Sequence, residues 1–209
     1  MIDVAEVSVV ADGITLLPST SVGVAHGEAL IIRGNNGTGK TTLLRVLAGI
    51  RQPSTGSVQV AGEVVSQRNR SFRRKVATMI GIPPMAPDLT VRDHVTLVAA
   101  TWFNGNADIA VVAEQGLDQL GMASLGERFP HELSSGQTQL FGLCLVLARP
   151  FDVLILDEPE QRLDPERLGV VIDVLKALRD RGVTVVAATH SPVLAEHLGD
   201  RVLDLDRAS

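Results

Sequence analysis

Apolar and polar positions follow two different rhythms along the chain. In the first 82 residues, and again over residues 151–209, short apolar segments bounded by turn residues alternate with segments of helical period. The predicted strands are residues 4–10, 29–32, 57–65 (a pair broken at Ala61 and Gly62), 153–156, 183–188 and 201–205. The predicted helices are residues 41–50, 165–181 and 193–198. This alternation predicts an α/β core built from both ends of the chain.

The middle third of the chain has a different pattern. Three prolines between residues 83 and 87 interrupt it, and helical periodicity then dominates. The predicted helices are residues 91–101, 109–120 and 137–148. The first two are expected to end near Gly105 and Gly121. We therefore predict one domain of residues 1–209, in which residues 1–82 and 151–209 form an α/β core and residues from about 83 to 150 form an inserted helical subdomain.

Composition and charge narrow the class of protein. Hydrophobic residues make up 45% and charged residues 21% of the 209, which is ordinary for a globular chain. The net charge of −5 and the isoelectric point near 5.5 argue against nucleic acid as a partner. One basic cluster stands out, and it consists of Arg68, Arg70, Arg73, Arg74 and Lys75. A solvated charged face is the favoured interpretation of this cluster, and contact with a partner or an anionic lipid surface is the alternative.

The single cysteine and the first residues bear on the compartment. Cys144 has no partner for an internal disulfide, which fits a reducing compartment, and its apolar neighbours predict a buried, inert thiol. Residues 1–6 include acidic side chains where a secretion signal needs basic ones. No uncharged apolar stretch approaches the roughly 18 residues that cross a bilayer. We therefore expect a cytoplasmic chain, and any membrane role requires a separate partner.

The most specific chemical motif is the sequence Gly-Asn-Asn-Gly-Thr-Gly-Lys-Thr at residues 34–41, between a predicted strand and a predicted helix. Its glycines let backbone N–H groups converge on phosphate oxygens, and the N-terminus of the following helix adds positive potential. Lys40 supplies a point charge beside the phosphates, and the Thr41 hydroxyl is placed to ligate Mg²⁺. The loop therefore predicts a bound nucleoside triphosphate with magnesium.

Two other predicted strands end in polar residues. Asp157 and Glu158 follow one apolar strand, and His190 follows another. In doubly wound sheets ligands bind at the carboxyl ends of the strands, so Asp157 is expected to hold the metal and Glu158 to orient or deprotonate an attacking water. His190 is expected to donate a hydrogen bond to the γ-phosphate. Alone, the acidic pair also fits a solvated loop and the histidine a structural role, but the phosphate loop favours the catalytic interpretation. The other histidines have no metal-ligand spacing, and we expect them at the surface or packed inside the protein. They are His26, His94, His131 and His197.

Several motifs occur in a fixed order along the chain. The phosphate loop is followed by Leu-Ser-Ser-Gly-Gln at residues 133–137, then by the acidic pair, by Leu163-Asp164 and by His190. In this order they resemble the ATP-binding subunit of ABC transporters over essentially the whole chain. The resemblance implies a P-loop NTPase fold, with a mixed sheet, flanking helices, a small N-terminal antiparallel β part and an inserted α-helical subdomain. The compact size looks like that of small exporter-type subunits, including the haem-exporter group.

The same resemblance implies a head-to-tail dimer, either a homodimer or a heterodimer with another ATPase subunit, that holds two ATP molecules with Mg²⁺. The implied contacts to ATP within one subunit are Asn35, Asn36, Gly37, Thr38, Gly39, Lys40, Thr41 and Thr42, with Thr41 and Asp157 at the metal. The implied contacts to ATP of the opposite subunit are Ser134, Ser135, Gly136 and Gln137, with Asp164 crossing the interface. Lys40, Glu158 and His190 would be catalytic. The helical subdomain would dock an integral-membrane permease, so that the subunit is peripheral on the inner face of the cell membrane.

Some positions depart from the pattern of this family. No aromatic residue occurs in residues 10–14, where the family stacks adenine, and this predicts weakened discrimination against GTP. Ile82 stands where the family has a magnesium-binding glutamine that senses the permease. Arg162 occupies a position that is usually small, and Ser135 replaces a glycine. The phosphate end of the site is therefore expected to be complete, and coupling to the permease is expected to differ.

Two alternative functions remain at this point. The first is a soluble, non-transport ABC ATPase acting on DNA or ribosomes. Such proteins usually carry a second nucleotide domain or long insertions, which this sequence does not have, and the acidic net charge of the chain also disfavours nucleic-acid partners. A weakly hydrolysing, nucleotide-binding regulatory subunit fits the missing glutamine and the missing adenine aromatic. Glu158 and His190 count against that second alternative.

Overall fold

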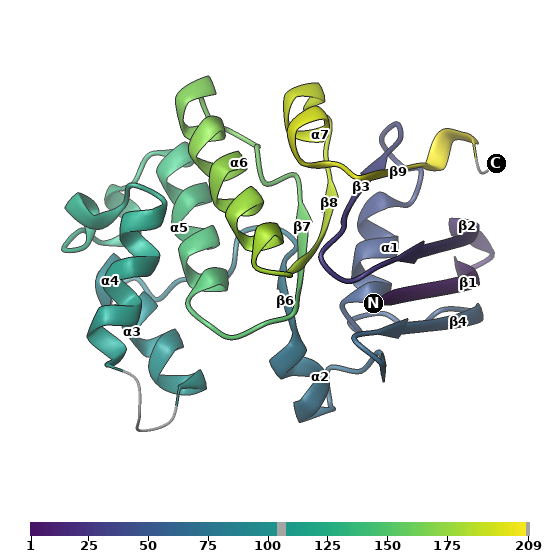
Figure 1. The fold of residues 1–209 in the computed structure, drawn as a ribbon, viewed down its shortest axis with the longest axis horizontal. Helices are drawn as coiled ribbons and strands as arrows, with labels where there is room; N and C mark the ends of the chain where they lie inside the picture. Colours follow the sequence, from purple (N-terminus) through teal and green to yellow (C-terminus); the bar gives the residue numbers. More distant parts are fainter. Residues whose placement is uncertain (104–107, 208–209) are drawn as a thin grey trace. The chain divides into compact units, whose positions relative to one another are not determined.

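The computed structural model describes residues 1–103 and 108–207 of the chain (Figure 1). The chain divides into two compact units. The α/β unit consists of Met1–Ile80, Phe151–Glu158 and Leu175–Ser209, and the helical unit consists of Gly81–Pro150 and Pro159–Val174. None of the described helices combines the length with the apolar composition that crossing a bilayer requires.

The α/β unit contains a four-stranded antiparallel sheet with the strand order β2-β1-β4-β5. Its strands are β1 (Ile2–Ala11), β2 (Ile14–Val24), β4 (Thr55–Val60) and β5 (Glu63–Val64). A two-residue turn joins β1 to β2, and its residues Asp12 and Gly13 have φ of 51° and 76°, as the tightest hairpins require. The sequence pattern does not predict β2, because shifts in its pairing with β1 break the alternation of buried and exposed positions.

The second sheet of the α/β unit is parallel, with the strand order β6-β7-β8-β3-β9. Its strands are β3 (Ala29–Arg33), β6 (Val76–Met79), β7 (Val153–Asp157), β8 (Thr184–Ala188) and β9 (Arg201–Asp204). The central strands are buried along almost their whole length, which explains their continuous apolar sequences. Ile32 and Asp157 both pair with Ala188, so β3, β7 and β8 end at the same edge of the sheet.

The helices of the α/β unit are α1 (Lys40–Leu47), α2 (Arg70–Lys75) and α7 (Pro192–Leu198). Helix α1 packs against β7 and β8 and buries Leu43, Leu44 and Leu47 completely. It ends earlier than the predicted residue 50 because Gly49, with φ of 68°, adopts the left-handed conformation that terminates helices. Helix α2 and strand β6 are short and follow no extended apolar period, so the pattern does not predict them.

The helical unit contains α3 (Val91–Trp102), α4 (Ile109–Gln119) and α5 (Ser135–Leu147), with short 3₁₀ turns at Ala123–Leu125 and Pro130–Glu132. Helix α6 (Pro165–Asp180) begins in this unit, and its last residues belong to the α/β unit. The side chains of Thr90, Asp108 and Ser134 cap the first turns of α3, α4 and α5. The predicted helix end near Gly105 lies outside the described residues. The predicted fold class, an α/β core with an N-terminal antiparallel sheet and an inserted helical subdomain, is confirmed.

We expect the thiol of Cys144 to be unreactive in the native chain. The residue lies in α5 and is completely buried, and this burial raises the pKa of its thiol from 9.0 to about 12. At a pH near 9, where an exposed thiol is half ionised, Cys144 stays protonated. Titration with a thiol-specific disulfide reagent should detect no thiol in the folded chain and one after unfolding in guanidinium. Rapid labelling of the folded chain at this pH would contradict the burial of Cys144.

Candidate nucleotide-binding site

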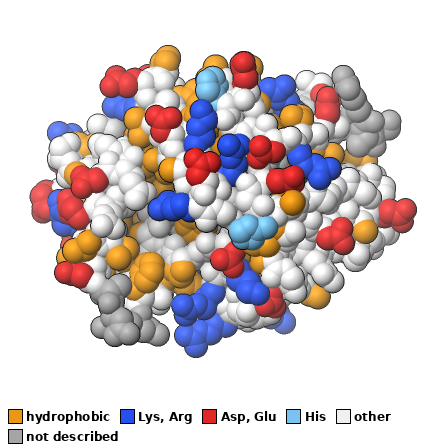
Figure 2. Space-filling model, in the orientation of Figure 1, with side chains coloured by type: hydrophobic (Ala, Val, Ile, Leu, Met, Phe, Trp, Pro, Cys, Tyr) orange, Lys and Arg blue, Asp and Glu red, His pale blue; other side chains and the backbone are white. Residues whose placement is uncertain are grey.

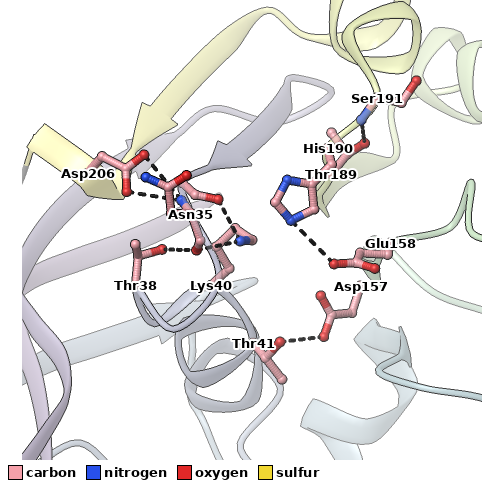
Figure 3. A network of polar contacts seen from close by, with 11 residues as sticks. Asn35, Thr38, Lys40, Thr41, Asp157, Glu158, Thr189, His190, Ser191 and Asp206 are labelled. Carbon is pink, nitrogen blue, oxygen red and sulfur yellow. Dashed lines mark hydrogen bonds and ion pairs between the residues drawn. The ribbon is translucent and has the colours of Figure 1, made fainter.

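The phosphate loop lies between β3 and α1 in the α/β unit (Figure 3). Gly39, the residue before α1, has φ of 103°, and a Cβ at this position would lie 2.7 Å from the Leu16 carbonyl oxygen. Only glycine therefore fits there. No side chain caps the N-terminus of α1, so its first N–H groups are available to an anionic ligand.

Lys40 folds back over the loop that precedes it. Its Nζ donates hydrogen bonds to the carbonyl oxygens of Gly34 at 2.7 Å and Asn35 at 2.9 Å. The residue is only 7% exposed, so its ammonium group is held at the loop and away from bulk water. The loop is closed further by Thr38, whose Oγ1 donates to the Asn35 carbonyl oxygen at 3.0 Å. These bonds hold one positive charge at the phosphate loop.

Thr41 and Asp157 are brought together from α1 and the end of β7. Thr41 Oγ1 donates a hydrogen bond to Asp157 Oδ2 at 2.7 Å (Figure 3). A hydroxyl and a carboxylate at this spacing supply two hard oxygen donors. Mg²⁺ is commonly held by one or two such side chains together with phosphate oxygens and water, so the pair fits this ion.

Glu158 and His190 lie at the ends of the neighbouring strands β7 and β8. His190 Nε2 is 3.5 Å from Glu158 Oε1, and both side chains are accessible to solvent. Glu158 has φ of 48°, which is unusual outside glycine, and its N–H donates to the Ala188 carbonyl oxygen at 2.9 Å. This sharp turn directs the carboxylate away from the strand axis and toward the histidine (Figure 3).

A cavity of about 350 Å³ joins most of the predicted phosphate-binding residues. Its lining consists of Asn36, Gly37, Gly39, Lys40, Thr41, Thr42, Glu158 and three residues of β2, namely Ile14, Thr15 and Leu16. Ile14 ends the stretch of residues 10–14 in which the family resemblance places the adenine contact, whereas Thr15 and Leu16 are not expected at the site because the strand β2 is not predicted. The structure therefore places a partly apolar wall beside the phosphate loop, in which Ile14 is 63% exposed.

The remaining predicted residues lie in the helical unit. Ser134 caps α5: its Oγ accepts from the Gln137 N–H at 3.3 Å, and its own N–H donates to Gln137 Oε1 at 2.9 Å. Asp164 forms an ion pair with Arg167 at 3.3 Å. A Cβ on Gly136 would lie 2.7 Å from the Arg162 carbonyl oxygen, so this glycine allows a close backbone approach. A second cavity, of about 360 Å³, is lined in part by Gln137, Asp164 and Arg167.

Asp206 is a residue at the phosphate loop that the sequence pattern does not predict. Its two carboxylate oxygens accept from the Asn35 N–H at 3.0 and 3.2 Å. Asp206 lies in a 3₁₀ turn that follows β9, and the parallel pairing of β9 with β3 carries it to the loop. No local sequence signal marks this contact, because it depends on the order of the strands.

A buried strand, a glycine loop and an uncapped helix, in the same sheet as a second strand that ends in a carboxylate, define a P-loop nucleotide-binding protein. The family described as ABC transporter matches residues 17–161. An uncharacterized ABC transporter ATP-binding protein of Mycobacterium tuberculosis is 36% identical over 185 residues, which is 86% of this chain and 74% of that protein. A putative ABC transporter ATP-binding protein of Streptomyces coelicolor is 37% identical over 196 residues, covering 93% and 74% of the two chains.

A solved structure of a dimeric ATP-binding cassette, in a post-hydrolysis state with ADP and phosphate, has the same fold. Its TM-score is 0.87 at 22% identity, and the match covers 98% of this chain and 94% of that one. The chain belongs to the ABC transporter family, as an ATP-binding subunit.

Proposed function

We propose that this subunit hydrolyses ATP with Mg²⁺ and thereby drives transport through a separate membrane permease. The observation that carries this proposal is the convergence of Lys40, Thr41 and Glu158 on one cavity, with Asp157 bonded to Thr41 and His190 beside Glu158. The residues proposed to contact ATP in this unit are Asn35, Asn36, Gly37, Thr38, Gly39, Lys40, Thr41 and Thr42. Hydrolysis is also the reaction whose products, ADP and phosphate, occupy the solved cassette of the same fold.

In the proposed reaction a water oxygen attacks the γ-phosphorus, the bond to the bridging oxygen of ADP breaks, and phosphate leaves. Glu158 Oε1 accepts the proton of this water, and His190 Nε2 donates a hydrogen bond to the γ-phosphate. Lys40 and the amides of the loop hold the phosphates in line. Thr41 and Asp157 would hold Mg²⁺, which when bound neutralises part of the phosphate charge.

The active assembly is proposed to be a dimer, with either a second copy or another ATPase subunit. Its supports are the dimeric state of the similar solved cassette and the arrangement of the helical unit, where Ser134 caps α5 and Asp164 precedes α6. In this assembly Ser134, Ser135, Gly136 and Gln137 contact ATP held by the opposite subunit, and Asp164 crosses the interface. The narrower resemblance to haem-exporter subunits stays a prediction.

The proposal is tested by isolating the subunit from its native membranes and identifying what accompanies it. Recovery of a multi-helix membrane protein would support a permease-bound subunit that is peripheral on the inner face of the membrane. The identity of that membrane protein would also test the haem-exporter resemblance. Ribosomal or DNA-repair partners would contradict the transport function. A preparation whose ATP hydrolysis stays at the background rate with the permease present would favour a regulatory subunit.

We expect GTP to compete with ATP more effectively than in subunits that stack adenine on an aromatic ring. The wall of the cavity near β2 offers Ile14 and no aromatic side chain. Losing a stacking partner costs on the order of 1 kcal/mol, about a factor of five in affinity. Competition titration of bound ATP with GTP measures this directly, and Ile14→Phe should raise ATP affinity relative to the wild type. Failure of GTP to displace ATP at large excess would show that the base is recognised by other contacts.

A further inference from the structure

Positive charge is concentrated in one segment of this acidic chain. Residues 29–87 contain nine Lys and Arg residues and a single acidic residue, Glu63, although the whole chain has a net charge of −5. The rest of the chain therefore carries a net charge of −13. An anionic partner attracts the basic segment and repels the acidic remainder of the chain. This asymmetry of charge would therefore turn the basic segment toward such a partner.

Helix α2 presents much of this charge to solvent. Phe72 is completely buried and fixes the inner face of the helix, while Arg70 and Arg74, four residues apart, are exposed together on the outer face. Arg68 is exposed directly before the helix. In Figure 2, Lys and Arg side chains gather at the lower edge of the molecule, over the position of α2 in Figure 1. We call Arg68, Arg70 and Arg74 the basic surface.

The one acidic group of the segment does not neutralise the basic surface. Glu63 accepts from Ser71 Oγ at 2.7 Å and from Asn69 Nδ2 at 3.1 Å, and it pairs with Lys75 at 3.0 Å. The Ser71 hydrogen bond, together with Lys75, lowers the pKa of Glu63, so the carboxylate stays ionised and engaged in this network. Within the described part of the chain, no ion pair joins the side chains of the basic surface to an acid. Their three positive charges are therefore available to a partner.

An anionic lipid surface fits these charges better than an acidic pocket or a nucleic acid. Arg70 and Arg74 share an exposed face of α2, and Arg68 is exposed two residues before the helix. The strongly negative remainder of the chain opposes wrapping by a long polyanion. Val64 is 70% exposed in the edge strand β5, whose other residue, Glu63, bonds to Ser71 of α2. A planar array of phosphate headgroups can meet all three arginines at once.

We propose that the basic surface binds anionic phospholipid headgroups and orients the subunit at the membrane. The inference rests on the proposed function only in that the subunit works beside a membrane permease. Each arginine near an anionic bilayer is expected to raise membrane partitioning about fivefold, and salt is expected to weaken it. Removing all three charges should therefore lower partitioning on the order of 100-fold.

The test measures co-sedimentation of the purified subunit with vesicles of phosphatidylglycerol and phosphatidylcholine, without permease and without nucleotide. Wild type should bind at low ionic strength and be released by added salt, and vesicles of phosphatidylcholine alone should not bind it. The triple variant Arg68→Ala, Arg70→Ala, Arg74→Ala should lose binding, whereas lysine at the same three positions should retain it. The matched control Arg128→Ala, Arg181→Ala, Arg201→Ala removes the same number of exposed charges elsewhere and should bind like the wild type.

Four outcomes would overturn the proposal. They are absence of binding to anionic vesicles, equal loss in both triple variants, equal binding to neutral vesicles, and normal binding of the alanine variant to anionic vesicles. If the alanine variant binds vesicles normally but no longer accompanies the permease, the surface is a protein contact instead. The vesicle experiment contains neither ATP nor permease. A negative vesicle result would therefore not contradict the proposed ATP hydrolysis or permease binding. In the same way, an absence of ATP hydrolysis would not change the conclusion about vesicle binding.

Discussion

Replacing Glu158 by glutamine is expected to slow ATP hydrolysis by about 100- to 10,000-fold while ATP binding is retained. Glutamine has the same shape but cannot accept the proton of the attacking water. The backbone turn that orients this side chain is held by the hydrogen bond from the N–H of residue 158 to the Ala188 carbonyl oxygen, and the substitution leaves this bond in place. Release of phosphate under steady-state conditions measures the rate, and titration with ATP measures binding.

The same variant should accumulate as a dimer at saturating ATP, because the sandwich forms and hydrolysis no longer opens it. Light scattering with and without ATP checks the mass. Glu196 is exposed on helix α7 of the same unit, so Glu196→Gln removes an equal charge and should hydrolyse ATP at the wild-type rate. A Glu158→Gln chain that stays monomeric at saturating ATP would show that two copies of this chain do not form the sandwich, and would point to a different ATPase subunit as the partner.

The parallel sheet is predictable from the sequence because its strands are buried on both faces. Strand β8 has five buried residues in succession, and β7 has four before it ends in Asp157, so each appears as an uninterrupted apolar run. The hairpin strand β2 gives no such signal, because pairing irregularities separate its buried positions and Pro18 interrupts it. Its location follows from its pairing with β1, which is a tertiary property.

The site residues that could be predicted are those that follow a continuous apolar strand or begin a helix. Lys40, Thr41, Asp157 and Glu158 stand at such ends, and the fold brings them together because β3, β7 and β8 share one edge. Asp206 is different, since its contact with Asn35 spans 171 positions and arises from the pairing of β9 with β3. A contact of this kind has no period, motif or spacing by which the sequence alone would mark it.

Replacing Lys40 by methionine is expected to weaken ATP binding by on the order of 10- to 100-fold. The methionine side chain keeps an unbranched apolar stem but removes the ammonium group that now donates to the Gly34 and Asn35 carbonyl oxygens. When ATP binds, this ammonium is the one side-chain cation of the loop that can face the β- and γ-phosphates, so a charge-assisted hydrogen bond is lost. Isothermal titration with ATP in the presence of magnesium measures the change.

The control for this variant separates binding from folding. Lys176→Met changes a partly exposed lysine of α6 and should leave the affinity for ATP unchanged. The two carbonyl oxygens that lose their donor in Lys40→Met can be solvated from the cavity, so its thermal midpoint without nucleotide should stay close to that of the wild type. The difference should appear only in the stabilisation by ATP, because a ligand stabilises the folded state in proportion to how tightly it binds. Equal ATP-induced shifts in wild type and Lys40→Met would contradict the placement of the triphosphate at this loop.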